Sequence, residues 1–516
     1  MESSQVVAVD EAGSGDQARP ANPVAAWLDR AIIGCLFALA FCAPHSIAAT
    51  QGFWVLGLAL WTARLFARPR PRLRFHRTKI AHLLLAFLGL TVISSLFSYD
   101  VPVSVDRLRG VMLMTIVFLV AENIPNRRVL RQLALVLVAS CMINVVFTIG
   151  ERVIGRGVKV RALVAASPLR AAGIEEGDTL LALDGHKLHN PDEIDRALAQ
   201  GGPGSEPARV TIYRFERIFD VDVPRGQLLS GTTAAARLGV AGWSRGRDWR
   251  AAGFYGHYAT YAEVLQLIAS LAVGLLVALP DKRTLPGLLL AAAIAGMSVA
   301  LFLTITRASW LSFLISTFVI VLIGAGRRAV LVMLLAAAVV IPIGLFMLQQ
   351  KRNVGFYDTK DGSITWRQTV YREGLQLLIS RPRHLIVGIG MDSIKSHWRE
   401  WGMFDHGRLP RGHMHSTPLQ LALERGLPAL FVWLALLAVY ARMLWLLARS
   451  GRVADWVERG IVFGALGGLA GFFASGMVHY NMGDSEVIMI FYFLMGLALK
   501  IDAECRARDD KNAWRG

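Results

Sequence analysis

Long apolar runs separated by polar loops recur along most of this chain, and they constrain its fold more than any other feature. A membrane-spanning helix needs about 20 mostly apolar residues, and about twelve runs approach that length. Of the 516 residues, 54% are hydrophobic and 18% are charged, whereas soluble domains carry about 25% charged residues. The sequence therefore predicts an all-α polytopic membrane protein. The expected spans lie near residues 28–48, 52–67, 80–98, 110–123, 130–150, 258–280, 285–304, 309–325, 328–348, 417–447, 459–478 and 484–501.

The formal net charge of +17 is distributed in a pattern that favours membrane topology over nucleic-acid binding. Basic residues cluster in alternate loops, such as those at 127–128, 327–328 and 449–452, whereas the loop at 44–52 contains no Lys or Arg. Cytoplasmic loops of membrane proteins are enriched in these two residues. We therefore expect a cytoplasmic N-terminus and a multi-pass protein of the bacterial inner membrane.

This topology places two long insertions on the outward, periplasmic side, where ATP and nucleotide sugars are absent. Chemistry on that side therefore needs another donor. The expected segments are a disordered cytoplasmic tail over 1–22, helices over 23–150, a folded insertion over 156–226, helices over 248–348, a periplasmic catalytic loop over 349–416, helices over 417–502 and a cytoplasmic tail over 503–516.

The first insertion changes from continuous apolar runs to strand alternation and one amphipathic helix. Ser167–Ile174 leads into Glu176–Gly185, in which Gly-Asp and Asp-Gly turn signals bracket a strand. A helix is predicted over 191–200 and a returning strand over 208–215. This pattern resembles a bacterial PDZ domain. The resemblance implies a small α+β fold that captures an extended peptide by strand addition; a fold that only packs against the membrane helices is the alternative.

Four outward residues beside predicted spans are the candidates for chemistry, because ionisable groups near membrane depth are more often functional than ornamental. Arg250 precedes the sixth span, Arg307 lies in a short turn between the seventh and eighth spans, Arg367 leads a predicted helix, and His415 opens the tenth span. The alternatives are interfacial snorkelling for Arg307 and a solvated basic patch for Arg250. Arg367 could instead pair with Glu373 or Asp361, and His415 could be a simple helix cap.

Two other kinds of site receive less support from the sequence. His406, His413 and His415 could bind a metal together with Asp405, but their spacing fits no strong zinc signature, and we expect no metal and no cofactor. An intramembrane protease is also unlike this chain, since it has no His-Glu-x-x-His motif.

A family resemblance follows from the motif around His415. His415-Ser416, nine further residues and Gly426 are similar to a pattern of the O-antigen ligase and polymerase superfamily. The segment Arg250–His257, the turn Thr304–Arg307 and the pair Gly388 and Gly390 also resemble that superfamily. Ala429 and Ser416 depart from its usual Gly and Asn, and a PDZ-like insertion is not a usual part of its pattern.

The resemblance implies a GT-C-like glycosyltransferase architecture and a glycan transfer from an undecaprenyl-diphosphate carrier to an acceptor hydroxyl. Guanidinium groups bind phosphate oxygens in bidentate fashion, so Arg250, Arg307 and Arg367 are expected to hold the diphosphate. His415 is expected to act as general base, with His413 and His257 in support, in an inverting reaction that uses no metal.

The acceptor stays open between a lipid core, as in lipopolysaccharide biosynthesis, a second glycan in a polymerase, and a protein in an O-oligosaccharyltransferase. A non-enzymatic glycan transporter or assembly scaffold is the alternative from another class. It predicts several polar groups in mid-span, and charged residues there are nearly absent.

Overall fold

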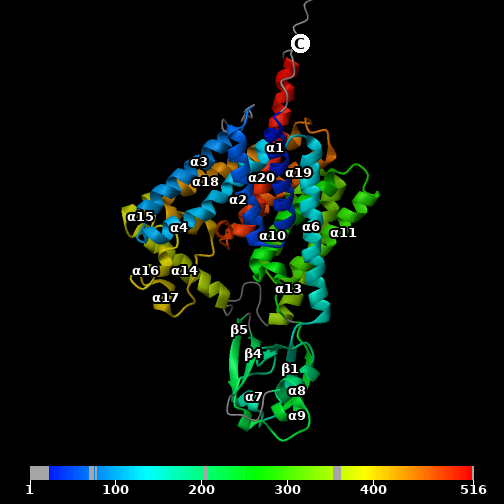
Figure 1. Cartoon of the computed structure of the whole chain (residues 1–516), viewed down its shortest axis with the longest axis vertical. Helices are drawn as coiled ribbons and strands as arrows, with labels where there is room; N and C mark the ends of the chain where they lie inside the picture. The colour runs from blue at the N-terminus through cyan, green and yellow to red at the C-terminus, as the bar shows by residue number, and fades with distance from the viewer. Residues whose placement is uncertain are drawn as a thin grey trace, which may run out of the picture.

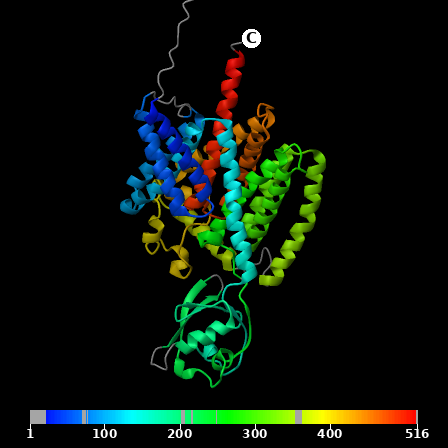
Figure 2. The ribbon, with the colours of Figure 1, turned by 45° about the vertical axis from the view of Figure 1, so that its right-hand side comes forward.

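A computed structural model describes residues 22–68, 75, 78–200, 207–214, 217–247, 249–352 and 362–513. It consists of a helical bundle with a small sheet domain at one end (Figures 1 and 2). The helix α6 (Arg127–Ile154) leaves the bundle and enters the sheet domain, and α10 (Tyr258–Ala278) follows that domain back into the bundle. The sheet domain therefore joins the two parts of the bundle at one end of the molecule.

Helices occupy every apolar run that the sequence predicts to span a membrane. Eight of them are long and apolar enough to do so by length and composition: α1 (Pro23–Cys42), α3 (Lys79–Leu96), α6, α10, α11 (Leu285–Leu303), α12 (Arg307–Gly324), α18 (Thr417–Arg449) and α19 (Trp456–Gly476). The remaining runs form α2 (Ile47–Phe66), α4 (Val101–Val111) with η2 (Met112–Met114) and α5 (Thr115–Asn123), α13 (Arg327–Arg352) and α20 (Ser485–Ala513). The chain is thus a multi-pass membrane protein.

The first two helices begin earlier than the sequence predicts. The first expected span reaches residue 48, but α1 ends at Cys42 and Ser46 caps α2 by accepting the backbone N–H of Ala49 at 3.3 Å. The first outward loop is consequently a turn of a few residues, since residues 47–52 are helical. A serine at an N-cap position satisfies a donor that helix geometry leaves open.

The sheet domain has the strands β1 (Val158–Leu163), β2 (Thr179–Leu183), β3 (His186–Lys187), β4 (Ala208–Arg214), β5 (Arg217–Val223) and β6 (Val240–Arg245). They form an antiparallel sheet in the order β5-β4-β2-β1-β6, with β3 paired to β2. The short helices are α7 (Pro168–Ala171), α8 (Pro191–Gln200), η3 (Arg225–Gln227) and α9 (Ala234–Leu238). The predicted helix over 191–200 is confirmed, and Ile194 and Leu198 of its apolar face are buried.

The sheet domain extends beyond the expected range of 156–226, because β6 pairs along β1 from Val158 to Leu163. The two ends of the domain also meet. Arg156 N–H donates to the carbonyl of Gly246 at 2.9 Å, and Gly246 N–H donates to that of Gly157 at 3.2 Å. Its buried apolar side chains form a cluster separate from that of the helical bundle. The domain is therefore inserted as a unit with adjacent entry and exit.

Hydrogen bonds join the turns at the end of the bundle nearest the sheet domain. Tyr255, in η4 (Gly253–Tyr255), donates its hydroxyl to Ala43 O at 2.7 Å, and Asn144 Nδ2 donates to Pro44 O at 2.6 Å. Ala251 N–H donates to Leu303 O at 3.0 Å. The segment after the sheet domain, the first turn and the turn between α11 and α12 thus form one connected layer.

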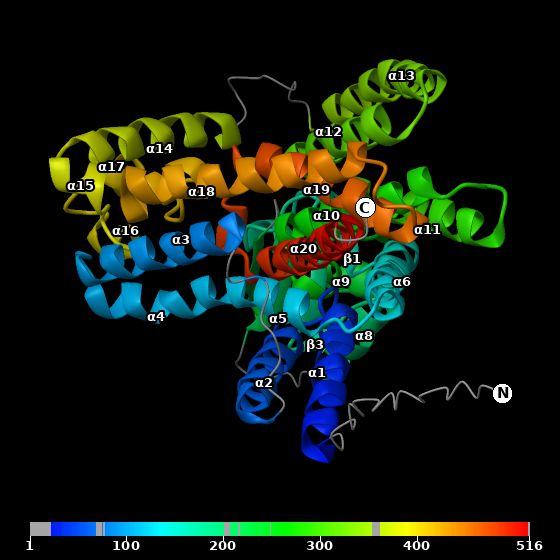
Figure 3. The same cartoon turned by 90° about the horizontal axis from the view of Figure 1, so that it is seen from above.

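The second insertion is also mostly helical, with α14 (Gly362–Ile379), α15 (Pro382–Ile386), α16 (Ser393–His397) and α17 (Met403–Gly407). Seen from above, these elements lie with α3, α4 and α18 on one side of the molecule (Figure 3). Within the expected loop over 349–416, the described residues from Gly362 to Gly407 therefore form a small helical layer on this side.

The helix α18 is broken at Gly426, where φ is +81°. The break leaves two carbonyls of the first segment without helical partners, and the Gly388–Gly390 segment supplies them. Ile389 N–H and Gly390 N–H donate to the carbonyls of Leu423 and Glu424, each at 2.9 Å. A backbone break at membrane depth is tolerated only where protein groups satisfy it. The glycine pattern noted in the sequence is explained by this pairing.

Replacing Gly426 by alanine is expected to destabilise the folded chain by about 2 kcal/mol or more, because φ there is positive and a Cβ would collide with the carbonyl of Ile386. Thermal unfolding in detergent measures the effect. The control is Gly89→Ala in α3, where a Cβ meets nothing within 4 Å. Equal melting temperatures for the two variants would contradict this account.

Candidate functional site

The backbone around His415 is held by contacts on both sides. His415 has a left-handed φ of +47°, which a non-glycine residue adopts only when its surroundings impose it. Its N–H donates to His413 Nδ1 at 3.2 Å, and its carbonyl accepts the Tyr371 hydroxyl at 2.8 Å. The preceding Met414 is buried, and its N–H donates to Gln420 Oε1 at 2.7 Å. The first turn of α18 thus fixes the direction of the His415 side chain.

The His415 imidazole lies in a partly aromatic setting with an open hydrogen-bonding position. Trp366 meets it edge-on, with ring centroids 4.7 Å apart, and the His413 ring lies 4.2 Å away. Trp366 is oriented by its own bond to Pro410 O at 3.2 Å. Nδ1 of His415 is buried and has no hydrogen-bond partner among the described residues. A buried nitrogen without a partner is costly unless a ligand completes it.

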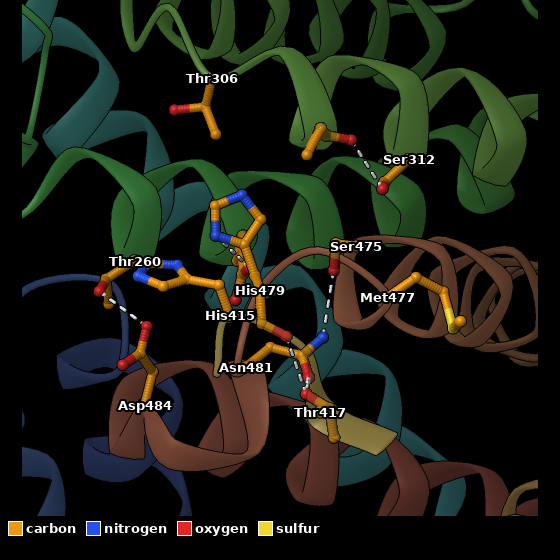
Figure 4. Close-up of polar contacts among 12 residues, drawn as sticks. Thr260, Thr306, Ser312, His415, Thr417, Ser475, Met477, His479, Asn481 and Asp484 are labelled. Carbon is orange, nitrogen blue, oxygen red and sulfur yellow. Dashed lines mark hydrogen bonds and ion pairs between the residues drawn. The ribbon is translucent and has the colours of Figure 1, made fainter. Parts of the chain in front are cut away.

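A second histidine, His479, lies beside His415, with ring centroids 6.4 Å apart (Figure 4). It belongs to the turn between α19 and η5 (Asn481–Gly483). The Thr417 hydroxyl lies 3.0 Å from the carbonyl of His479 and 2.7 Å from Asn481 Oδ1, and Asn481 Nδ2 donates to Phe472 O at 2.7 Å. These bonds connect the start of α18 to the turn that carries His479.

His479 is not among the site residues predicted from the sequence, although one signal could have found it. It is an ionisable residue in a short turn between two apolar runs, which is the criterion that singled out Arg307. Its Nδ1 lies 3.9 Å from Oε1 of Glu263, a buried carboxylate of α10. Neither carboxylate oxygen of Glu263 has a hydrogen-bond partner among the described residues. This neighbour comes from a run that the sequence predicts to span the membrane.

His257, Thr260 and Asp484 form a chain of hydrogen bonds on another side of the site. Thr260 donates its hydroxyl to Asp484 Oδ2 at 2.9 Å (Figure 4). His257 Nδ1 lies 3.1 Å from the same hydroxyl. His257 also caps α10, since its Nδ1 accepts the N–H of Thr260 at 3.4 Å. His257 is therefore a structural residue that holds the start of α10 beside Asp484 through Thr260. Burial raises the pKa of Asp484, and the bond from Thr260 opposes that rise.

Two of the expected arginines contribute to the electrostatics of the histidines. Burial is the main cause of the lowered pKa values of His415 and His479; the charge of Arg367 in α14 adds to both shifts, and that of Arg250 adds to the shift of His479. The guanidinium carbon of Arg250 lies 4.2 Å from the centre of the Tyr258 ring. Arg307 is the first residue of α12, next to the turn that Ala251 N–H joins.

All three histidines carry lowered pKa values. Burial is the main cause, and it brings the pKa of His413 to about 4, that of His415 to about 2 and that of His479 to about 3. Neighbouring positive groups add to the effect, because they disfavour a further positive charge. At neutral pH the three imidazoles are uncharged, and an uncharged imidazole is able to accept a proton.

Two acidic residues were possible partners of Arg367. The carboxylate of Glu373 accepts the N–H groups of Phe404 and Asp405 at 2.7 and 3.0 Å. Asp361 lies outside the described residues. Among the described residues, no three His, Cys, Asp or Glu side chains are grouped as a metal site would require.

Comparison with known proteins adds a family to this geometry. Residues 290–434 match the model of the O-antigen ligase family. The chain carries an O-antigen ligase domain. This domain contains Arg307, Arg367, His413 and His415, whereas Arg250, His257 and His479 lie outside it. Members of the family transfer glycosyl groups, and the match covers less than half of the chain.

One curated relative is similar over a short stretch. The magnetosome formation protease MamE of Magnetospirillum gryphiswaldense is 31% identical over 81 residues, which are 16% of this chain and 10% of that protein. The chain thus spans about a tenth of the relative's length.

The lowered pKa values predict a loss of stability in acid. Between about pH 6.5 and pH 4 the unfolded chain protonates these histidines while the native chain does not, so stability falls as the pH falls. The upper limit is about 1.4 kcal/mol per pH unit for each histidine. Melting temperatures in detergent from pH 7.5 to 5 measure it. His413→Asn should flatten this slope, and the exposed His82→Asn should not; equal slopes would contradict the assignment.

Proposed function

We propose that this chain is a bacterial inner-membrane glycosyltransferase that acts at the periplasmic face. It moves a glycan from an undecaprenyl-diphosphate carrier to an acceptor hydroxyl, with inversion and without a metal. One observation carries the proposal: an uncharged histidine, His415, has a buried nitrogen that lacks a partner and lies close enough to Arg367 to be influenced by its charge. The O-antigen ligase domain, which includes both residues, supports the same reading at the level of the family.

In the proposed reaction the acceptor hydroxyl attacks the anomeric carbon of the donor sugar. The new bond forms from the acceptor oxygen while the bond between that carbon and the diphosphate oxygen breaks, and His415 takes the hydroxyl proton. The electron pair of the broken bond leaves with the lipid diphosphate. General base catalysis of this kind contributes about 10²–10⁴-fold to a rate.

The arginines have the complementary role of holding the leaving diphosphate. Arg307 is the first residue of α12, Arg250 lies in the loop before η4, and Arg367 lies in the first half of α14. Guanidinium groups bind phosphate oxygens as planar forks, and groups fixed before the reaction stabilise charge that develops during it. Binding of this anion would also raise the pKa of His415, since negative charge favours the imidazolium.

His413 and His479 are positioning residues in this scheme. His413 accepts the N–H of His415 and thereby supports its strained backbone. His479 adds an uncharged ring on the side of Glu263. Neither is needed as the base.

The proposed reaction has three versions, which differ in the acceptor. A ligase uses a lipid core, a polymerase uses a second carrier-linked glycan, and a protein O-oligosaccharyltransferase uses a polypeptide. The sheet domain, with its own apolar cluster and adjacent ends, is a PDZ-like module in the protein-acceptor version, where it would hold an extended peptide.

His415→Asn is expected to lower glycan transfer by at least about 10²-fold without loss of folded protein. Asparagine tolerates the left-handed backbone conformation of this position, so the substitution tests the imidazole rather than the turn. His406→Asn is the matched control, since His406 is an exposed histidine of the same insertion with a φ of +54°. Transfer is measured in membrane vesicles as product released from the carrier lipid. Wild-type activity of His415→Asn would refute the general base.

Excising residues 157–245 and joining Arg156 to Gly246 should preserve the helical bundle, because those two residues already share a hydrogen bond. With a lipid or glycan acceptor, transfer should persist. With a protein acceptor, glycan should move from the protein fraction to hydrolysed or free product. Separate extraction of lipid, protein and free-polymer fractions reads the result. Loss of all transfer by a folded, monodisperse variant would contradict a separate module.

A further inference from the structure

A cavity of about 1050 Å³ lies next to the histidine site. It is formed by α2, α3, α4, α18, α20 and the segment that follows Gly390. His413 and Tyr480 line it on the side of the histidine site, whereas Arg250, Arg307 and Arg367 do not line it. His413 thus has its ring 4.2 Å from that of His415 and also faces this cavity.

Arg425 is the feature of this cavity that the proposed reaction does not use. Its residue is only 5% exposed, and its guanidinium carbon lies 5.2 Å from the centre of the Phe87 ring. Nη2 lies 3.3 Å from the sulfur of Met391, and Nε has no hydrogen-bond partner among the described residues. No carboxylate of the described residues lies within ion-pair distance of it.

The neighbouring acidic side chain does not compensate this charge directly. Glu424 Oε1 accepts the N–H of Asp392 at 3.0 Å and Nε2 of Gln420 at 2.7 Å, and Oε2 lies 3.3 Å from the Tyr480 hydroxyl. Its oxygens are therefore engaged elsewhere. An ion that is buried without a close partner costs several kcal/mol, so the guanidinium is arranged for an anion that enters the cavity.

The rim of the cavity has further positive charge that is paired with two acids. Arg107 and Lys395 both bond to Asp392, with N–O distances of 2.7 and 3.0 Å, and Arg109, which lines the same rim, lies 3.4 Å from Asp106. Asp392 thus neutralises part of the rim, while Arg425 lies deeper and without such a partner. An anionic group would meet the rim first and Arg425 afterwards.

The opposite wall is apolar and belongs to α2. Trp54, Val55, Leu56 and Ala59 line the cavity there, and Val55 and Leu56 are largely exposed. A cavity with a basic wall and an apolar wall fits an amphiphile rather than a free phosphate, because hydrocarbon gains free energy when it covers apolar surface.

We infer that this cavity binds the phosphate group of a lipid, with Arg425 as its buried contact and the lipid chains along α2. The inference rests on the proposed function. In that reaction the lipid bound in this cavity is the second substrate, and it reaches His415 on the side of His413. A phosphorylated lipid acceptor and a second polyprenyl diphosphate carry the same chemistry, and the two sources are distinguished by experiment.

The test measures lipid binding to the purified full-length protein by native mass spectrometry in detergent. The probes are phosphatidic acid, diacylglycerol with the same chains, and undecaprenyl diphosphate. Arg425→Met removes the buried charge, and Ala59→Trp fills the cavity from its exposed apolar wall. Ala48→Trp is the matched control, since Ala48 is an exposed residue of α2 that does not line the cavity.

Both cavity variants should weaken binding of at least one phosphorylated lipid ten-fold or more, while diacylglycerol binding stays as in the wild type and Ala48→Trp changes nothing. A loss confined to phosphatidic acid identifies a phosphorylated lipid acceptor, and a loss confined to undecaprenyl diphosphate identifies a second carrier lipid. Wild-type binding of both phosphorylated lipids by Ala59→Trp would overturn the inference, and this variant keeps the test valid if Arg425→Met does not fold.

Failure of the proposed function would look different. His415→Asn should abolish transfer and retain the lipid at this cavity. If His415→Asn stayed active while the cavity variants lost binding, the general base would be wrong and the phosphate site would stand. If His415→Asn were inactive while the cavity variants bound lipid as the wild type does, the general base would stand and the phosphate site would be wrong.

Discussion

The pairing of the broken helix α18 with the Gly388–Gly390 segment is the interaction on which both sites depend. Gly426 interrupts the helix, and the carbonyls of Leu423 and Glu424 are satisfied by N–H groups of that segment. The first part of α18 is thereby a short, separately anchored helix. His415 lies just before its first residue and Arg425 is the last residue before the break. A single backbone constraint thus fixes the orientation of a histidine and of a buried guanidinium.

Much of this arrangement could be predicted from local sequence. Apolar runs predicted the membrane helices, helical periodicity predicted α8, strand alternation predicted β4, and the spacing from His415 to Gly426 marked the segment in which we propose the general base. The neighbours of those residues could not be predicted. Glu263 and His479 are more than 200 positions apart in the chain and meet only because α10 and α19 pack together. Register between helices in a bundle is set by tertiary packing, which short sequence windows do not contain.

Unsatisfied polar groups and strained backbone occur in and around the two proposed sites. His415 Nδ1, Arg425 Nε and both oxygens of Glu263 lack hydrogen-bond partners among the described residues, and left-handed φ values occur at His415 and at three consecutive residues, Phe404–His406. Each of these costs free energy in the folded chain. Proteins keep such features mainly where function requires them, so their concentration supports a substrate site independently of any family resemblance.

The low pKa of His415 has a consequence for the order of events in the proposed reaction. Without an anion nearby, burial and the positive neighbours keep this imidazole a weak base. Arrival of a diphosphate among the arginines would offset those positive charges and strengthen the base at that moment. Proton abstraction would then be favoured only while the donor is bound, which reduces unproductive reaction at an empty site. The same positive charges would bind the donor and, once the donor neutralises them, would no longer lower the pKa of His415.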